Sequence, residues 1–303
     1  MTIEKGHIQA NGLNFAWLAD GPRDGAVVLL LHGFPEGKES YTEQLGALAK
    51  AGYRAVAPDL RGFGESDAPQ GVEAYAMPHL LADVSGIIHA LGEERVHLVG
   101  HDWGALVGWP FVSRHPELVR SWTSLSIPHP TPLGRASGLD GSGQADPDQQ
   151  ARSSYVGLFH KAGKAEELLL ADGADRLRSM LKMSPPGVDG IPDAQVDEFV
   201  SGFERPGRLT AALNYYRANL KPQAYASFPP VPNPISTPTL LVWGDSDMAL
   251  GRRAVEETAE YMTGPYRLEV LAGAGHWLQY ERAEDVSRLI VEHLNQVGAT
   301  QGQ

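Results

Sequence analysis

One stretch of this 303-residue sequence decides the fold: Val96-His97-Leu98-Val99-Gly100-His101-Asp102-Trp103-Gly104-Ala105-Leu106-Val107. Its first residues predict a strand that is buried on both faces and ends at Gly100, and a helix is expected to begin near Trp103. Glycine stands two residues before and two residues after Asp102, which is the pattern of a nucleophile elbow. Glycine is needed there because strand and helix approach so closely that side chains would clash. Taken alone, the motif fits an aspartate that merely caps a helix equally well.

Further apolar runs predict other strands of the same sheet, and segments with helical periodicity, such as residues 78–91, lie between them. Asn11-Gly12 predicts a hairpin between residues 6–10 and 13–18. This alternation predicts an α/β fold, a mostly parallel sheet flanked by helices. The other expected strands are residues 26–31, 53–58, 121–127 and 239–243.

The alternation stops after Pro128. Residues 131–150 are rich in Gly, Ser, Asp and Gln and predict a loop, whereas residues 153–181 and 194–220 predict helices. The proline-rich residues 228–238 predict a stiff linker back to the sheet. We therefore expect a core domain of residues 1–129 and 235–303, with a helical cap domain of residues 130–234 inserted into it.

The composition excludes several classes of protein. The absence of cysteine excludes disulfides, thiolate nucleophiles and cysteine-bound metals. The 37 acidic and 25 basic residues give a net charge of −12, which disfavours nucleic acid and membrane surfaces as partners. No apolar run approaches the ~20 residues that span a bilayer, and no signal-peptide pattern is present. We expect a cytoplasmic protein, with a homodimer as one candidate assembly.

An aspartate in place of a serine at the elbow changes the available chemistry. A carboxylate has a reference pKa of about 3.9, so Asp102 is already ionised at neutral pH and needs no base before it attacks. Attack on an ester carbonyl would give an anhydride, whereas attack on a saturated carbon with a leaving group gives an alkyl ester that water can cleave. Asp102 therefore disfavours esterase and peptidase activity and favours epoxide opening or halide displacement.

Cleavage of such an ester needs a base and an acid that orients it, and in this fold the chain order is nucleophile, acid, histidine. Asp245 and Asp247 follow the expected strand 239–243, and His276 lies in a glycine-rich loop further on. A helix cap explains Asp247 alone, and an ordinary loop position explains His276 alone. The ordered set of three is hard to explain by chance, although spacing does not choose between the two aspartates.

A second turn is expected to face the elbow. It reads His32-Gly33-Phe34-Pro35-Glu36 and follows the first long buried strand. The backbone amides of Phe34 and Trp103 could together hold the oxyanion that forms when water attacks the ester. A plain turn built on Gly33 and Pro35 is the alternative.

With these residues in place, the chain resembles the α/β-hydrolase superfamily and, within it, the epoxide hydrolases. The resemblance implies an α/β-hydrolase fold with a cap, assigns the acid to Asp247, and places Glu36 near the hydrolytic water. A solvent-exposed turn carboxylate is the alternative for Glu36. Residues 37–41 depart from the family, which usually carries tryptophan and arginine there, so the shape of the entrance stays open. The motifs that carry the resemblance are residues 32–36, 59–66, 100–104 and 275–277.

The expected cap carries the more discriminating matches. Ala212-Leu213-Asn214-Tyr215-Tyr216-Arg217 is similar to the family motif whose tyrosine assists ring opening, which implies that role for Tyr216. A looser match over residues 153–159 implies the same role for Tyr155. An epoxide oxygen leaves as an alkoxide, which is a poor leaving group without a proton. Two phenols could hydrogen-bond to this oxygen and protonate it as it leaves. The alternative is that both are aromatic residues of the cap interior.

The sequence therefore predicts a hydrolase without cofactor or metal that opens a small apolar epoxide with Asp102 and then uses water, giving a diol. A haloalkane or haloacetate dehalogenase with the same nucleophile is one alternative. Phe34 offers no side-chain N–H for a halide, and no arginine stands beside Asp102 to hold a carboxylate. A second alternative is a ligand-binding protein of this fold that catalyses no reaction. Such a protein would normally lack one of the three residues that form the ordered set of nucleophile, acid and histidine.

Overall fold

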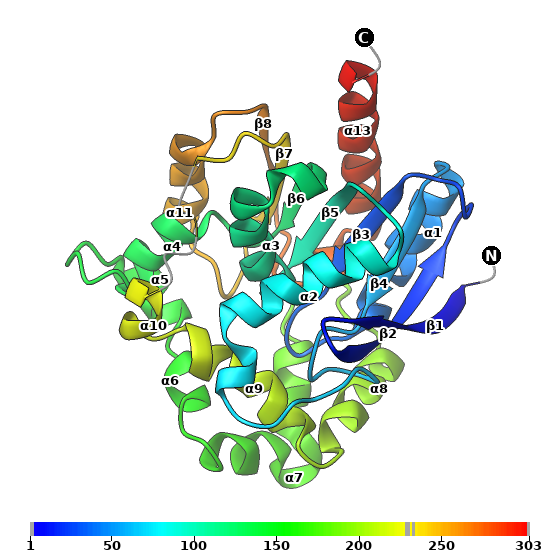
Figure 1. Cartoon of the computed structure of the whole chain (residues 1–303). Coiled ribbons are helices and arrows are strands. Elements are labelled where there is room, and N and C mark those ends of the chain that lie inside the picture. The colour runs from blue at the N-terminus through cyan, green and yellow to red at the C-terminus, as the bar shows by residue number, and fades with distance from the viewer. Residues whose placement is uncertain (1–2, 228–230, 232–233, 302–303) are drawn as a thin grey trace.

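The computed structural model describes residues 3–227, 231 and 234–301 (Figure 1). Within these residues, eight strands form one sheet in the order β1-β2-β4-β3-β5-β6-β7-β8. β2 pairs antiparallel with β1 and β4, and all other neighbours are parallel. The strands are β1 (Glu4–Ala10), β2 (Leu13–Asp20), β3 (Val27–Leu31), β4 (Arg54–Pro58), β5 (Val96–His101), β6 (Val119–Leu125), β7 (Thr239–Gly244) and β8 (Tyr266–Leu271).

The expected hairpin is confirmed at the start of the sheet. β1 and β2 pair in register from Glu4 opposite Ala19 to Ala10 opposite Leu13. The two residues between them, Asn11 and Gly12, have φ of 47° and 74°. Such a turn favours asparagine followed by glycine because both residues must adopt positive φ.

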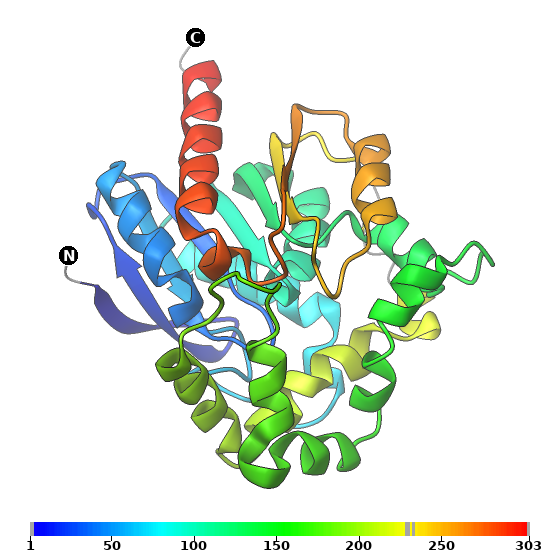
Figure 2. The ribbon, with the colours of Figure 1, turned by 180° about the vertical axis from the view of Figure 1, so that it is seen from behind.

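Helices cover both faces of the sheet, as Figures 1 and 2 show from opposite sides. Val28 and Leu30 of β3 belong to the apolar cluster that includes side chains of α1 and α13, whereas Leu29 and Leu31 belong to the cluster on the other face. β3 is therefore apolar throughout because both of its faces are buried. The flanking helices are α1 (Thr42–Lys50), α2 (Met77–Ala90), α3 (Trp103–Arg114), α11 (Arg252–Glu257), α12 (Leu278–Glu281) and α13 (Ala283–Gln301).

The helical insertion, defined here as helices α4 to α10, lies between β6 and β7 in the chain. In Figures 1 and 2 its helices α6 to α9 lie beyond the sheet edge where the parallel strands end, opposite the protruding end of α13. The helices are α4 (Pro130–Ser137), α5 (Pro147–Arg152), α6 (Val156–Phe159), α7 (Lys164–Leu181), α8 (Asp193–Glu204), α9 (Arg208–Asn219) and α10 (Pro222–Ser227).

The loop predicted for residues 131–150 is wrong, because α4 and the start of α5 lie within it. Pro130 and Pro147 each occupy a first helical position, where the missing amide hydrogen costs nothing. The His129 side chain accepts a hydrogen bond from the Thr131 amide, and the Asp146 side chain accepts one from the Asp148 amide. These start signals outweigh the glycine-rich composition.

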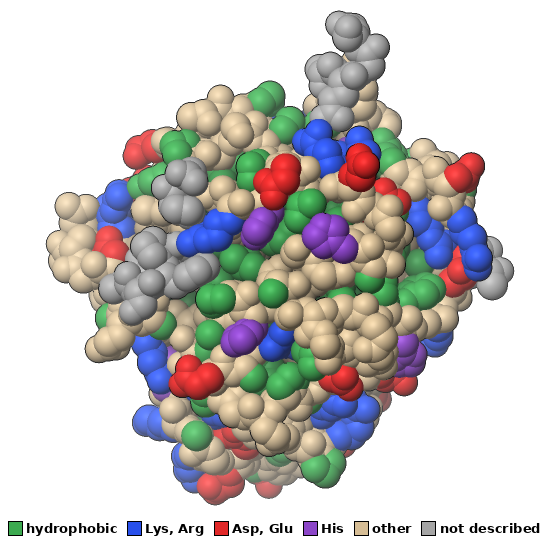
Figure 3. Space-filling view, viewed as in Figure 1, with side chains coloured by type: hydrophobic (Ala, Val, Ile, Leu, Met, Phe, Trp, Pro, Cys, Tyr) green, Lys and Arg blue, Asp and Glu red, His purple; other side chains and the backbone are tan. Residues whose placement is uncertain are grey.

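Part of the linker predicted for residues 228–238 lies outside the described residues, namely 228–230 and 232–233. The boundaries expected at 129/130 and 234/235 therefore stay a prediction. Among the helices that the structure describes, none combines the length and hydrophobicity needed to cross a bilayer. On the face in Figure 3, acidic and basic side chains are interspersed, so the negative net charge is not gathered there into one patch.

Candidate active site

The elbow between β5 and α3 has the strained geometry that its glycines predict. Asp102 has φ 48° and ψ −117°, a backbone conformation that residues other than glycine rarely adopt. A Cβ on Gly100 would lie 2.6 Å from the carbonyl oxygen of Gly104, and a Cβ on Gly104 would fall on the carbonyl oxygen of Leu31. The close approach of the strand and helix backbones therefore excludes side chains at both positions.

The turn after β3 meets the elbow directly. The Phe34 amide donates a hydrogen bond of 2.7 Å to Oδ1 of Asp102. A Cβ on Gly33 would collide with the same carboxylate, so this position also needs glycine. Trp103 is the first residue of α3, where a helix has amides without partners in its own backbone. The structure thus brings the Phe34 amide onto the carboxylate, and Trp103 follows Asp102 directly in the chain.

The acid and the histidine come from the loops after β7 and β8. Nδ1 of His276 lies 2.9 Å from Oδ2 of Asp247, and Nε2 lies 3.8 Å from Oδ2 of Asp102. Asp247 is fully buried, and its Oδ1 accepts hydrogen bonds from the amides of Ala249 (2.7 Å) and Leu250 (3.0 Å). His276 therefore lies between the two carboxylates.

Asp245, the other candidate acid, has a different position. It is exposed, and its Oδ1 accepts a hydrogen bond of 2.7 Å from the Gly273 amide. Its carboxylate thus ties two loops together at the surface, while Asp247 is the one that hydrogen-bonds to the histidine.

The charges of these groups are coupled. Burial alone would lower the pKa of His276, but the negative charges of Asp247 and Asp102 outweigh it and raise the pKa well above 6.5. Burial would also raise the pKa of Asp102, but His276 and the Phe34 amide hold that pKa below 3.8. The two carboxylates therefore favour the charged form of His276, and His276 favours the charged form of Asp102.

Glu36 is 2% exposed, so the alternative of a solvent-exposed turn carboxylate is wrong. Its Oε2 lies 2.9 Å from Nδ1 of His101, and its Oε1 accepts a hydrogen bond of 2.6 Å from Gln279. The other ring nitrogen of His101 donates to the carbonyl oxygen of His276 at 2.9 Å. Glu36 is therefore joined through His101 to the backbone of His276.

The two tyrosines lie near the nucleophile on elements of the insertion. Tyr216 belongs to α9 and Tyr155 immediately precedes α6, with their ring centroids 6.3 Å apart. Burial first and the charge of Asp102 second raise the pKa of both phenols, so both are neutral proton donors at neutral pH. The neighbouring Tyr215 points elsewhere and donates to the carbonyl oxygen of Arg61 at 2.9 Å.

Aromatic packing fixes the Tyr216 ring. It meets Trp103 edge-on with centroids 4.9 Å apart, Phe159 at 4.8 Å and Phe34 at 5.8 Å. Such contacts stabilise by about 0.5–1.5 kcal/mol each beyond the buried area. Phe34 and Trp103 belong to the turn after β3 and to the elbow, so the insertion packs onto both of these turns.

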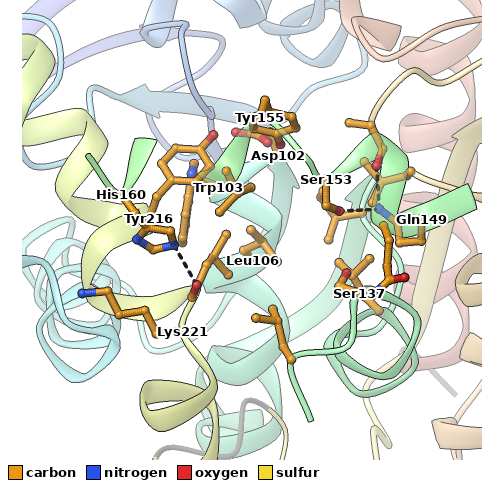
Figure 4. A pocket seen from close by; sticks show the side chains of 18 of the residues that line it. Asp102, Trp103, Leu106, Ser137, Gln149, Ser153, Tyr155, His160, Tyr216 and Lys221 are labelled. Atoms are coloured by element: carbon orange, nitrogen blue, oxygen red, sulfur yellow. Dashed lines mark hydrogen bonds between the residues drawn. The ribbon is translucent and has the colours of Figure 1, made fainter. Parts of the chain in front are cut away.

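Two cavities open beside these residues, and both are lined by Asp102, Tyr155 and Tyr216. Their volumes are about 430 Å³ and about 270 Å³, so the larger lies within the range of about 300–1,000 Å³ that is usual for small-molecule sites, and the smaller lies just below it. Figure 4 shows the larger cavity, with Asp102 and Tyr155 at one end and Ser137 and Lys221 at the other. No group of three His, Asp or Glu side chains suited to a metal ion occurs among the described residues.

The sequence analysis missed two residues of α5 that bind the loop after β7, which carries Asp247 and is called the acid loop below. Gln149 is buried, donates to the carbonyl oxygen of Ala249 (2.8 Å) and accepts from the Gly251 amide (2.8 Å). Arg152 donates to the carbonyl oxygen of Asp247. These contacts join residues about 100 positions apart, and no local pattern signals them.

Comparison with known proteins adds to this geometry. The model of the alpha/beta hydrolase fold family matches residues 26–283. Epoxide hydrolase 3 of Xenopus tropicalis is 37% identical over 290 residues, which cover 94% of this chain and 76% of that protein. Epoxide hydrolase A of Mycobacterium tuberculosis is 34% identical over 320 residues, covering 95% and 96%. The crystal structure of epoxide hydrolase A from Mycobacterium thermoresistibile matches with a TM-score of 0.82 at 30% identity, covering 97% of this chain and 98% of that one.

The chain therefore belongs to the α/β-hydrolase fold family, and within that family to the epoxide hydrolases.

Proposed function

We propose that this protein converts a small apolar epoxide to a vicinal diol through a covalent ester of Asp102. One observation carries the proposal: an ionised carboxylate occupies the nucleophile position, beside a histidine and in one cavity with two neutral phenols. A carboxylate attacks saturated carbon productively, and neutral phenols are the donors that a departing alkoxide needs.

In the first step Oδ2 of Asp102 attacks one epoxide carbon and the bond from that carbon to the epoxide oxygen breaks. Oδ1 is the atom bound by the Phe34 amide, so it becomes the carbonyl oxygen of the ester. Tyr155 and Tyr216 hold the departing oxygen, and one of them donates its proton. The tyrosine regains a proton that originates from His276. Charge is conserved, because the carboxylate and the imidazolium are both neutralised as ester, hydroxyl and neutral imidazole form.

In the second step His276 removes a proton from water, and the resulting hydroxide attacks the ester carbonyl carbon. The bond between that carbon and Oδ2 then breaks, and the diol leaves with Oδ2 and takes up the proton of the added hydroxyl group. Asp102 ends as a carboxylate and His276 as an imidazolium, as before the first step. Esterification has removed the Asp102 charge that helped to raise the pKa of His276, so the neutral ring becomes accessible when a base is needed. Asp247 keeps the ring oriented. The amides of Phe34 and Trp103 stabilise the oxyanion on Oδ1, a contribution worth about 3 kcal/mol per donor.

We further propose that Glu36, together with His101, orients the water molecule that attacks the ester. We also propose that residues 130–234 form a cap domain that covers the site. A homodimer and a cytoplasmic location stay predictions. Sedimentation velocity measures the oligomeric state. A single species with the monomer mass over a wide concentration range would count against the homodimer.

One turnover in heavy-oxygen water, with enzyme in excess over styrene oxide, tests the covalent step. We expect a diol without the isotope in that first cycle, because its new oxygen comes from Asp102, and labelled diol after many cycles. A labelled diol from the first cycle overturns the ester mechanism. Incubation with 1-bromobutane tests the dehalogenase alternative, for which bromide release without diol formation from epoxides would be decisive.

A further inference from the structure

The indole N–H of Trp103 is a buried hydrogen-bond donor beside the nucleophile, separate from the backbone amide of the same residue. The side chain is 1% exposed, and its N–H has no acceptor within hydrogen-bonding distance among the described residues. Trp109 on the same helix, in contrast, donates to the carbonyl oxygen of Ile127 at 3.1 Å. A buried N–H that has lost water and gained no partner is costly, so it points to an acceptor that is present during the reaction.

Three other buried indoles of the described chain also lack an acceptor, but their places differ from that of Trp103. Trp122 and Trp243 border neither cavity beside the nucleophile, and Trp277 borders the smaller one. Trp103 borders the larger cavity, and its ring packs against Tyr216. Of these four indoles, Trp103 is therefore the one placed to act on a proton donor of the site.

The hydroxyl group of Tyr216 is the acceptor that the geometry offers. The two rings meet edge-on, at 84° with centroids 4.9 Å apart, and lie side by side in Figure 4. Burial and the Asp102 charge raise the pKa of Tyr216, whereas the interaction with Trp103 lowers this pKa. A hydrogen-bond donor has this effect because it stabilises the charged phenolate more than the neutral phenol. The indole N–H therefore faces the phenol oxygen, although the resting structure has no hydrogen bond between them.

A phenolate at Tyr216 needs such a donor. When the hydroxyl gives its proton to the departing epoxide oxygen, the phenol becomes an anion packed against the rings of Phe34, Phe159 and Trp103. Aromatic carbon atoms are a poor replacement for water around a charge. The Tyr155 hydroxyl raises the pKa of Tyr216 and so does not favour the anion. The N–H of Trp103 is the group in this wall that favours it.

We propose that Trp103 is a positioning residue for ring opening, whose indole N–H donates to the phenol oxygen of Tyr216 and stabilises the phenolate that forms there. The proposal rests on the epoxide hydrolysis proposed above and assigns the transferred proton to Tyr216. The O–H bond of Tyr216 breaks, a new O–H bond forms on the departing alkoxide, and the phenolate then regains a proton that originates from His276. The hydrogen bond strengthens as the charge develops, so it accelerates ring opening and not ester hydrolysis, in which Tyr216 transfers no proton.

Removal of the indole N–H alone tests this role. Trp103→β-(3-benzothienyl)alanine keeps both fused rings and has sulfur in place of the N–H, and Trp103→Phe is the simpler variant. We expect both to slow single-turnover ester formation from styrene oxide by about tenfold and to leave ester hydrolysis within about twofold. Trp109→Phe is the matched control, because it truncates another buried indole of α3 and should leave both steps within about twofold.

The same two changes in a Tyr216→Phe background show whether Trp103 acts through the phenol. The phenol oxygen is absent there, so loss of the N–H should slow ring opening by less than about twofold further. An additional loss of about tenfold in that background would mean that Trp103 acts independently of Tyr216, and would overturn the proposal.

Ring opening by the benzothienyl variant at the wild-type rate would overturn the proposal as well. Trp103→Phe, compared in the two backgrounds, decides the question if the benzothienyl variant does not fold. If wild-type protein forms neither ester nor diol from styrene oxide, the proposed function fails and this inference fails with it. If wild-type protein forms the diol, each of the contrary results above removes the role of Trp103 alone.

Discussion

The core and the helical insertion hold their parts of the site by different means. In the core, backbone contacts fix the side chains: the elbow fixes Asp102, and two amides fix Asp247. In the insertion, ring packing fixes Tyr216, and Tyr155 lies at the edge of a four-residue helix. Backbone contacts of the core thus position Asp102 and Asp247, whereas the two tyrosines depend on side-chain packing within the insertion and against the core. Four substitutions and one pH series test this division.

The largest effect is expected in the core. Asp102→Ala removes the atom that forms the covalent bond, so diol formation should fall at least about 10⁴-fold. The measurement is the rate of diol release under saturating styrene oxide. Asp24→Ala is the matched control, because it removes an exposed carboxylate of the core and should leave the rate within about twofold. Comparable losses in the two variants would contradict the choice of nucleophile.

His276→Gln is expected to separate the two steps. Ring opening should continue more slowly, because the tyrosine must then regain its proton from water instead of His276, whereas ester hydrolysis should slow by about 10³-fold because the general base is gone. Intact-protein mass spectrometry should then show the protein plus the mass of one epoxide, with the added mass on the peptide that contains Asp102. His115→Gln, on a partly exposed histidine, is the control and should accumulate no adduct. Turnover of His276→Gln at the wild-type rate would remove His276 from the mechanism.

Tyr216→Phe tests the insertion. Ring opening should slow by about 10²-fold, because one proton donor is lost while the packed ring remains. Tyr215→Phe is a neighbouring control on the same helix: it loses the bond to the Arg61 carbonyl and about 1 kcal/mol of stability, with ring opening unchanged. Single-turnover ester formation distinguishes the two. Equal ring-opening rates for both variants would show that Tyr216 only packs.

Gln149→Leu tests the contact between the two regions. It leaves the Ala249 carbonyl and the Gly251 amide without their partner, so the acid loop should loosen and ester hydrolysis should slow by about tenfold, more than ring opening. The control is Gln150→Leu on the exposed neighbour. An equal decrease of both steps would indicate a general loss of folded protein instead.

The smallest effect concerns stability alone. The native pKa of His276 is raised above 6.5, so the stabilisation from its charge is complete below pH 6.5 and is lost as pH rises through the native pKa. Urea unfolding of wild-type protein and His276→Gln should therefore differ more at about pH 6 than at about pH 9. A difference that grows with pH would mean that the resting histidine is neutral.

The same division explains what the sequence could predict. β3, β5 and the elbow follow from local patterns, because a buried strand is uniformly apolar and a close backbone approach requires glycine. The proton-donor roles predicted for Tyr155 and Tyr216 rest on the resemblance to the epoxide hydrolases, because nothing in the spacing of these residues distinguishes a proton donor from a packed aromatic ring. No local sequence pattern indicates the contacts of Gln149, because its partners are about 100 residues away.

One expectation was wrong and one alternative is excluded, for related reasons. The helices α4 and α5 lie in a glycine-rich stretch whose composition obscures their proline starts and polar caps. The sequence alone does not exclude a surface carboxylate at Glu36, because its partners His101 and Gln279 lie 65 and 243 residues away and only the folded chain brings them together.

The attachment of α5 to the acid loop limits how a substrate can enter. Lifting α5 would break the contacts of Gln149 and Arg152 and pull Asp247 away from His276, so an opened enzyme would have no oriented base. A rearrangement of the insertion that leaves the acid in place must therefore keep α5 attached to the loop after β7. Entry by way of the surface at Met183, which lines the smaller cavity and is 48% exposed, meets this condition, because that route leaves the acid and the base in their working positions.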